Sequence, residues 1–424
     1  MKILIVNTYD SGGAANACLR LHEGLLQVGV DSKALIKRKE KPLPQTFKFQ
    51  KTYNRINKFQ ILKEKVILFF RVMGILNKPK ASQNQLFLKQ RQSGLELFSF
   101  PQSEFDITCS PLYQEADIIN LHWVANFLDY ESFFRKNTKP VVWTLHDMNP
   151  FTGGEHYLER FLEVDASGNP ISRVLSELEK RIFKENLALK FRAIQSASNI
   201  SVVAPSKWLK HEAQNSKVFK SKKTYCIPYG INAEVFKPRE KNYSRDILNI
   251  PKDKIVILFV ADSISNHRKG YSYLKNALDI MQREDVVLCA IGRKKSALES
   301  VMNTIELGSI YDERLMSMAY SAADVFVIPS LMDNLPNTVL ESLMCGTPVI
   351  GFPIGGIPDM IQEGENGLLT KTISSLALLE TIESFIETRD TYDRVSIREK
   401  AVNKYDLEIQ ADSYIELFKT ILKK

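Results

Sequence analysis

The stretch from Pro329 to Pro358 reads PSLMDNLPNTVLESLMCGTPVIGFPIGGIP, and it governs the interpretation of the whole chain. A turn that contains proline, Asn334 to Pro336, predicts the start of a helix. The Gly-Thr-Pro break at 346–348 predicts its end, and the apolar segment 349–352 then predicts a buried strand. Loop, helix and buried strand in this order indicate an α/β fold.

Two acidic residues frame this predicted helix. Asp333 lies just before it, and Glu341 follows eight positions later. A helix start offers unpaired backbone N–H groups and a partial positive charge, both of which favour phosphate groups. The two carboxylates can accept hydrogen bonds from two different sugars. The stretch therefore predicts a site for a ligand with hydroxyls at both ends and phosphates between them, as in a nucleotide-sugar.

The composition is that of an ordinary soluble globular protein. The chain has 424 residues, of which 44% are hydrophobic and 25% are charged, which is enough for two or more domains with buried cores. Neither a cleavable signal nor an apolar run long enough to span a bilayer is visible. The five scattered cysteines read as reduced core residues, so we expect a cytoplasmic protein without a disulfide framework or metal site.

The net charge of +8 is concentrated in one segment. Residues 33–91 hold 16 Lys and Arg against two acids, Glu40 and Glu64. Within this segment, 59–76 combines apolar residues at partly helical spacing with interleaved cations. Such a helix can lie on an anionic membrane surface, for example the inner face of the plasma membrane. An ordinary domain helix flanked by solvated lysines is an equal alternative, and both stay open.

The chain reads as two similar halves. Residues 2–7 predict a buried parallel strand, followed by a loop with Gly12 and Gly13 and then by a helix that ends near Gly29. A second series of strands and helices begins after 249–251. Further strands are predicted at 116–121, 140–145, 200–204, 255–261, 286–291, 324–328 and 347–352, and helices at 271–281 and 405–422. Two doubly wound α/β halves follow from this alternation, with a boundary near 228–251.

Several ordered motifs carry a family resemblance. They are the glycine loop Tyr9 to Ala14, Trp143-Thr-Leu-His-Asp-Met-Asn-Pro-Phe-Thr-Gly-Gly154, Ala204-Pro-Ser-Lys-Trp208, Ile227-Pro-Tyr-Gly-Ile-Asn232, Arg268-Lys-Gly270 and the stretch from Pro329. Together they resemble retaining glycosyltransferases of the GT-B architecture in family 4, with the local pattern of its colanic-acid, capsule and O-antigen type.

The resemblance implies two Rossmann-like domains that face each other across a cleft. The acceptor-side domain would be 1–230, with the basic insertion 33–91, and the nucleotide-sugar-binding domain would be 231–404. The final helix, 405–424, could cross back to the first domain. The resemblance also implies retention of the anomeric configuration, no cofactor and no required metal ion.

The resemblance also assigns roles on the donor side. Glu341 would hold the ribose hydroxyls, while Asp333, with the backbone N–H groups of Asn334 and Leu335, would hold the donor sugar. Asp333 stands where the family usually has glutamate, so the sugar contact can differ. Arg268 and Lys269 would offset the charge of the departing diphosphate, unless they form a plain surface pair.

The remaining site residues would come from the first half. His146 and Asp147 follow a predicted strand, where open α/β sheets place their ligands. By resemblance His146 would contact the donor sugar or its phosphate, and Asp147 would take part in donor binding; a structurally satisfied histidine is the alternative. His122 and Trp123 would line the acceptor side, with an even chance of a structural role. Gly12 and Gly13 would let the backbone approach the diphosphate or the acceptor.

We therefore expect a hexosyl- or N-acetylhexosaminyltransferase that moves a sugar from a UDP- or GDP-sugar to a glycan or lipid-linked glycan in surface polysaccharide synthesis. Two alternatives remain. A Rossmann-type NAD(P)-dependent oxidoreductase is disfavoured because Gly12-Gly13 lacks the G-x-G-x-x-G spacing. A basic nucleic-acid-binding protein is disfavoured because the charge lies in one segment without an aromatic stacking module or zinc motif.

Overall fold

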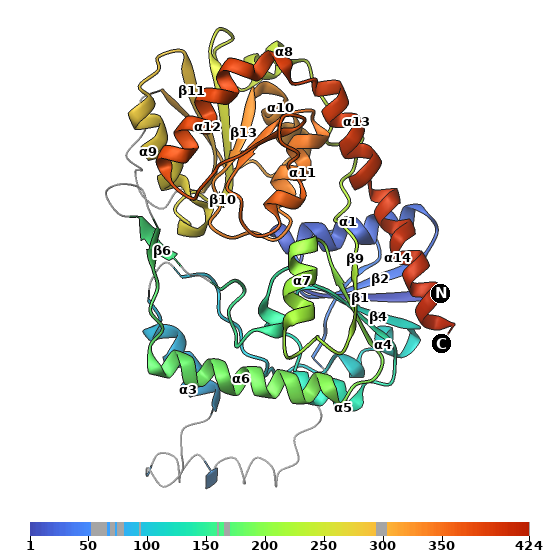
Figure 1. The fold of residues 1–424 in the computed structure, drawn as a ribbon. Helices are drawn as coiled ribbons and strands as arrows, with labels where there is room; N and C mark the ends of the chain where they lie inside the picture. Colours follow the sequence, from blue (N-terminus) through green and yellow to red (C-terminus); the bar gives the residue numbers. More distant parts are fainter. Residues whose placement is uncertain are drawn as a thin grey trace.

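Two α/β domains, each built around a parallel sheet, form the molecule in the computed structural model (Figure 1). The structure describes residues 1–51, 66–67, 73, 80–92, 95–158, 161–164, 170–293 and 303–423. The predicted basic helix at 59–76 lies almost entirely outside the described residues. The prediction of two Rossmann-like, doubly wound domains is confirmed.

The N-terminal sheet has seven parallel strands in the order β3-β2-β1-β4-β5-β8-β9. Their bounds are β1 (Lys2–Tyr9), β2 (Asp31–Arg38), β3 (Thr46–Lys48), β4 (Ile118–Leu121), β5 (Val141–Thr144), β8 (Ile200–Ala204) and β9 (Lys223–Cys226). The helices of this half are α1 (Gly13–Gln27), α3 (Lys80–Gln90), α4 (Pro111–Glu115), α5 (Tyr130–Lys136), α6 (Glu177–Gln195) and α7 (Lys207–Asn215). A small antiparallel hairpin, β6 (Phe161–Val164) with β7 (Pro170–Ser172), is added to it.

The C-terminal sheet has six parallel strands in the order β12-β11-β10-β13-β14-β15. Their bounds are β10 (Ile255–Ser263), β11 (Val286–Arg293), β12 (Thr304–Gly308), β13 (Val325–Ile328), β14 (Val349–Gly351) and β15 (Gly367–Leu369). The helices are α8 (Lys241–Ile247), α9 (Tyr271–Met281), α10 (Glu313–Ala322), α11 (Asn337–Met344), α12 (Ser375–Thr388), α13 (Arg394–Tyr405) and α14 (Leu407–Leu422).

In both sheets all strands are parallel, and the order in which the chain adds strands reverses near the centre of the sheet. In each sheet the first strand lies in the middle, and the chain winds outward first to one side and then to the other. The switch points lie between β1 and β4 and between β10 and β13. In open α/β sheets, ligands bind beyond the carboxyl ends of the strands at such points. A ligand-binding site is therefore expected in the loops that follow these four strands.

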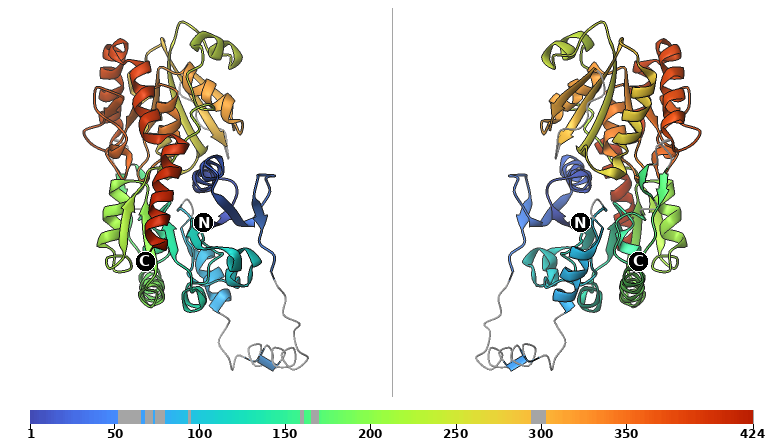
Figure 2. Two further views of the ribbon diagram at one scale, coloured as in Figure 1. Left: turned by 90° about the vertical axis from the view of Figure 1, so that its right-hand side faces the viewer. Right: turned by 90° about the vertical axis from the view of Figure 1, so that its left-hand side faces the viewer.

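The last helix, α14, returns to the N-terminal domain, where it packs against α1 (Figures 1 and 2). Its buried face inserts Tyr414, Leu417 and Phe418 into a core shared with Cys18 and Leu21 of α1. The sheet side of this core consists of aliphatic residues from β1, β2, β4, β5 and β8, and the hydroxyl of Tyr414 lies 2.8 Å from Thr144 Oγ1 of β5. The predicted crossing of the final helix is confirmed.

No strand lies between Cys226 and Ile255, so the chain passes from one sheet to the other within this segment. The exact domain boundary at 230 stays a prediction, as does the division at 404. Of the helices that the structure describes, none combines the length and the apolar character needed to cross a membrane.

The crossing helix should contribute to the stability of the first domain. Phe418 is fully buried, so Phe418→Ala should lower the free energy of unfolding by about 3–5 kcal/mol through lost burial and a residual cavity. Chemical denaturation of the full chain, followed by far-UV circular dichroism, measures this. Leu422→Ala, at a position that is 42% exposed, is the control and should change little. A loss below about 1 kcal/mol for Phe418→Ala would show that α14 is not docked.

Candidate active site

The start of α11 is the point around which the predicted donor residues gather. Asp333 and Asn334 lie in the loop that leads from β13 to α11, and the side chain of Leu335, the next residue, is buried in the core of the second domain. Gly355 has a positive φ of 59°, and a Cβ there would lie 2.0 Å from the Asp333 carbonyl oxygen. Only glycine allows this close packing of loop on loop. The loop before α11 is thereby fixed by backbone contacts.

Arg268 and Lys269 reach this loop from the segment after β10. Lys269 Nζ donates to Asp333 Oδ2 at 2.6 Å, and Arg268 Nη1 lies 3.4 Å from the same oxygen. Gly270, with a φ of 70°, lets the segment approach β13, because a Cβ there would lie 1.8 Å from the Pro329 carbonyl oxygen. Burial alone would raise the pKa of Asp333, but the two cations lower it. The carboxylate is therefore ionised at neutral pH.

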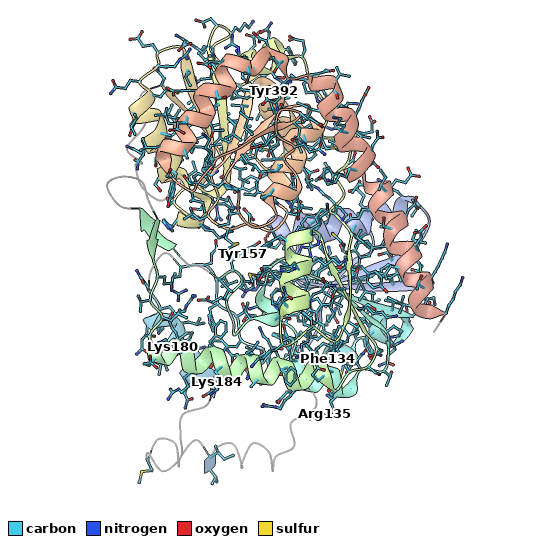
Figure 3. The ribbon with its side chains drawn as sticks, viewed as in Figure 1. Phe134, Arg135, Tyr157, Lys180, Lys184 and Tyr392 are labelled. Atoms are coloured by element: carbon cyan, nitrogen blue, oxygen red, sulfur yellow. The ribbon has the colours of Figure 1, made fainter. Side chains whose placement is uncertain are left out.

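Arg268 is also held by the N-terminal domain. Its Nε donates to Glu96 Oε1 at 2.7 Å, and Asn266 Nδ2 donates to the same oxygen at 2.8 Å. Its guanidinium also lies 4.7 Å from the ring centroid of Tyr157, which Figure 3 labels where the two domains face each other. Burial would raise the pKa of Glu96, but Arg268, Asn266 and Lys269 together lower it. Glu96 is thus a second carboxylate at the predicted diphosphate cations.

Glu341 lies on the buried side of α11 and joins the two domains. Its Oε1 accepts from Arg20 Nη2 of α1 at 2.8 Å, and its Oε2 accepts from Tyr320 OH at 3.1 Å. The same Arg20 nitrogen donates to Glu313 Oε1 at 2.7 Å. Each carboxylate oxygen has two lone pairs, so Glu341 can still accept from a sugar hydroxyl while these contacts persist. The contact between Glu341 and ribose stays a prediction.

The glycine loop of the N-terminal domain touches the start of α11 directly. Gly12 has a φ of 94° and precedes α1, and nothing lies within 4 Å of a Cβ built on it. The carbonyl oxygen of Gly13 accepts from Asn337 Nδ2, at the first residue of α11, at 2.9 Å. The start of α11 is therefore flanked by Gly13 on one side and by Lys269 and Asp333 on the other.

His146 lies at the domain interface, but both of its ring nitrogens already have protein partners. Its Nε2 lies 2.9 Å from His122 Nδ1, and its Nδ1 lies 2.9 Å from Tyr229 OH. Its carbonyl oxygen accepts from Asn334 Nδ2 of the C-terminal domain at 3.2 Å. The predicted contact of the His146 ring with the donor would require one of these partners to be exchanged. It stays a prediction.

The hydrogen-bond chain through the two histidines fixes their tautomers. Asn120 Nδ2 donates to the Val142 carbonyl oxygen at 3.0 Å, which leaves Asn120 Oδ1 to accept from His122 Nε2 at 3.0 Å. His122 Nδ1 must then accept, so His146 Nε2 carries the hydrogen and its Nδ1 accepts from Tyr229. The pair is neutral throughout, in agreement with burial, which lowers the pKa of His122 and takes that of His146 to about 4.

Asp147 and Trp123 form a second buried group next to this chain. Asp147 Oδ2 accepts from Trp123 Nε1 at 2.7 Å and from His156 Nδ1 at 2.5 Å. Asp147 Oδ1 accepts from the backbone N–H of Asn149 at 2.9 Å. The Trp123 ring stacks on His156 with centroids 5.0 Å apart. Asp147 is therefore a positioning group for Trp123, and its predicted role in donor binding stays untested.

No role was predicted from the sequence for Arg20, Glu96, Tyr157, Tyr229 or Tyr320, although Tyr229 lies within the quoted motif 227–232. Arg20 alone left a signal, because it is a charged residue on the apolar face of a helix between Ala17 and Gly24. Within the described residues, no group of three or more His, Cys, Asp or Glu side chains is arranged to hold a metal ion. The expected metal independence stays a prediction. A surface cavity of about 340 Å³ beside α13 contains none of the predicted site residues.

Residues 240–402 match the family model described as Glycosyl transferases group 1. This segment includes Arg268, Lys269, Asp333 and Glu341. Among curated proteins, Sulfoquinovosyl transferase SQD2 of Arabidopsis thaliana is 29% identical over 187 residues, which are 42% of this chain and 36% of that protein. The matches to the first curated relatives span about a third to a half of those proteins' length.

Solved structures of similar fold cover the whole chain. Sucrose-phosphate synthase from Thermosynechococcus elongatus has a TM-score of 0.68 at 18% identity, over 100% of this chain and 99% of that chain. HepE from Anabaena, in complex with UDP and glucose, has a TM-score of 0.63 at 16% identity, over 99% of each chain. The fold is therefore GT-B, and its C-terminal domain carries the sequence pattern of group 1 glycosyltransferases.

The neutral state of His146 predicts a specific dependence of stability on pH. The unfolded histidine titrates near 6.5 and the folded one near 4, so the unfolded chain binds more protons between these values. Stability should therefore fall as the pH falls through this window, by about 2 kcal/mol between pH 7 and pH 5 for this group.

Denaturant titrations at pH 7 and pH 5 measure this loss of stability. His146→Gln should reduce the loss by that amount, while His211→Gln, at an exposed position, should leave it unchanged. An equal loss in wild type and His146→Gln would contradict the neutral state assigned to His146.

Proposed function

We propose that this chain is a retaining glycosyltransferase that transfers a sugar from a UDP- or GDP-sugar to a hydroxyl of a glycan or lipid-linked glycan. The gathering of Asp333, Arg268 and Lys269 at the start of α11, with Glu341 further along the same helix, carries the proposal. The family match of residues 240–402 and the UDP found in HepE support the same reading. Surface polysaccharide synthesis, in the cytoplasm at the inner membrane face, is the proposed setting.

The diphosphate of the donor would lie at the start of α11. The backbone N–H groups there and the helix dipole favour its negative charge. Arg268 and Lys269 contact Asp333, in the loop just before this helix. In the structure these cations form ion pairs with Glu96 and Asp333. A bound diphosphate would replace some of these ion pairs with its own contacts to Arg268 and Lys269. The site would then stabilise the leaving group electrostatically, in the role that a metal ion has elsewhere.

The sugar would lie between Asp333 and the N-terminal domain, and Glu341 would hold the ribose. Both ring nitrogens of His146 are engaged by protein partners, so His146 is not free to act as a general base, and no side chain is an obvious nucleophile in the described interface. We therefore propose front-face substitution. The acceptor hydroxyl attacks the anomeric carbon, the bond to the diphosphate oxygen breaks on the same face, and the departing diphosphate takes the acceptor's proton.

A thermal-shift panel separates this function from the alternatives. We expect UDP or GDP, with or without a sugar, to raise the melting temperature by several degrees, because a ligand at 100 times its Kd adds about 2.7 kcal/mol of stability. ADP tests the choice of base, and NAD and duplex DNA represent the other two functions. A shift with NAD or DNA and none with any nucleoside diphosphate would overturn the proposal.

The role of Glu341 is testable with a matched control. Glu341→Ala should abolish donor turnover, measured as release of nucleoside diphosphate, and Glu341→Gln should weaken nucleotide binding by about tenfold or more, because a charged hydrogen bond contributes about 1.5–3 kcal/mol.

Glu313→Gln also removes a carboxylate partner of Arg20 but has no predicted contact with ribose, so it should retain turnover. Melting temperatures of all variants check that the interface has not opened. Full activity in a folded Glu341→Ala protein would contradict the assignment.

A further inference from the structure

A basic loop lies at the carboxyl edge of the N-terminal sheet. This basic loop, Lys37 to Lys41, comprises the last two residues of β2 and the three residues after them, at one side of the sheet next to α1, as Figure 2 shows in blue. From Lys37 to Lys41 every residue is a cation except Glu40. Arg38 and Lys41 are exposed, and within the described part of the chain neither side chain pairs with a carboxylate. Two uncompensated cations at the ligand-binding edge of a Rossmann-like sheet favour an anion there.

Two aromatic rings lie beside these cations. Tyr9, which pairs with Arg38 in the sheet, has its ring centroid 5.5 Å from that of Trp123. The guanidinium of Arg38 lies 5.5 Å from the Tyr9 centroid. Both rings are only partly buried, and the contact of Trp123 Nε1 with Asp147 at 2.7 Å fixes the indole. Partly exposed, fixed aromatic faces can pack against the C–H face of a sugar ring at little entropic cost.

The basic loop is tied to the proposed donor site. Asp10 Oδ2 accepts from the backbone N–H groups of Glu40 and Lys41 at 2.6 and 2.7 Å. Three residues later, the Gly13 carbonyl oxygen accepts from Asn337 at the start of α11. Three residues span at most about 11 Å. The backbone of the basic loop is therefore connected to the start of α11 through Asp10 and Gly13, although its cations belong to the other domain.

We propose that the acceptor is anionic and that this edge selects it. Arg38 and Lys41 bind a carboxylate or phosphate group of the acceptor, while its sugar ring packs on Tyr9 and Trp123. The inference rests on the proposed function, because it specifies the class of acceptor for the same reaction. The donor phosphates do not account for the loop, since they are served by α11, Arg268 and Lys269.

The test measures binding in the presence of saturating UDP, so that the donor site is occupied. Trigalacturonate supplies carboxylates, inorganic pyrophosphate supplies phosphates, and maltotriose is the neutral probe. We expect the protein to bind at least one of the two anions about tenfold or more tightly than maltotriose. The anion that binds more tightly shows whether the charged group of the acceptor is a carboxylate or a phosphate. The preference should weaken as salt is raised, because the cations are exposed.

The double variant Arg38→Gln/Lys41→Gln should lose most of this preference. Lys217→Gln/Lys220→Gln is the matched control, since it removes two exposed cations just before β9, at the opposite edge of the same sheet. UDP affinity should be equal in all three proteins. No preference in the wild type, a preference retained by the Arg38 and Lys41 variant, or an equal loss in the control would overturn the inference. Failure of every protein to bind a nucleoside diphosphate would instead overturn the proposed function.

Discussion

The buried guanidinium of Arg20 is the interaction on which the arrangement of the two domains depends. It projects from α1 of the first domain, lies 5.2 Å from the Phe236 ring centroid and ends between Glu313 and Glu341 of the second. A buried charge is costly unless it is paired, so separating the domains would leave Arg20 and Glu341 to be solvated anew. Glu341 consequently keeps one position on α11, facing the domain interface.

A second group of charges, at the start of α11, lies where the donor is proposed to bind. Arg268 and Lys269 share Asp333 within their own domain, and Arg268 also binds Glu96 from the other domain. Two cations and two carboxylates therefore balance at the start of α11 without any ligand. A diphosphate bound as proposed would add negative charge to this group and compete with Glu96, which provides one of the contacts between the domains. The proposed donor site and the domain interface therefore share Arg268.

Much of the fold could be predicted because buried parallel strands are recognisable as apolar runs, and β1, β10 and β11 appear within two residues of their predicted ends. β2, β3, β9, β12 and β15 were not predicted, because their lysines, threonines and glycines resemble loops, and only pairing with a neighbour makes them strands. Motif residues such as Asp333 could be predicted because their neighbours in the sequence, here a helix start and a second acid eight positions later, indicate their role. Arg20 and Glu341 are 321 positions apart, and nothing in either local sequence indicates that they meet.

The central claim is that a nucleoside diphosphate binds at the start of α11, between Asp333 and Glu341. Hydrogen–deuterium exchange of the full chain with and without UDP or GDP tests it most directly. The account predicts slower exchange in 329–345 and 266–270, with a smaller effect at the glycine loop around Gly12, and little change in α12 or α6. Protection confined to other segments, or nucleotide binding without protection of 329–345, would contradict the account.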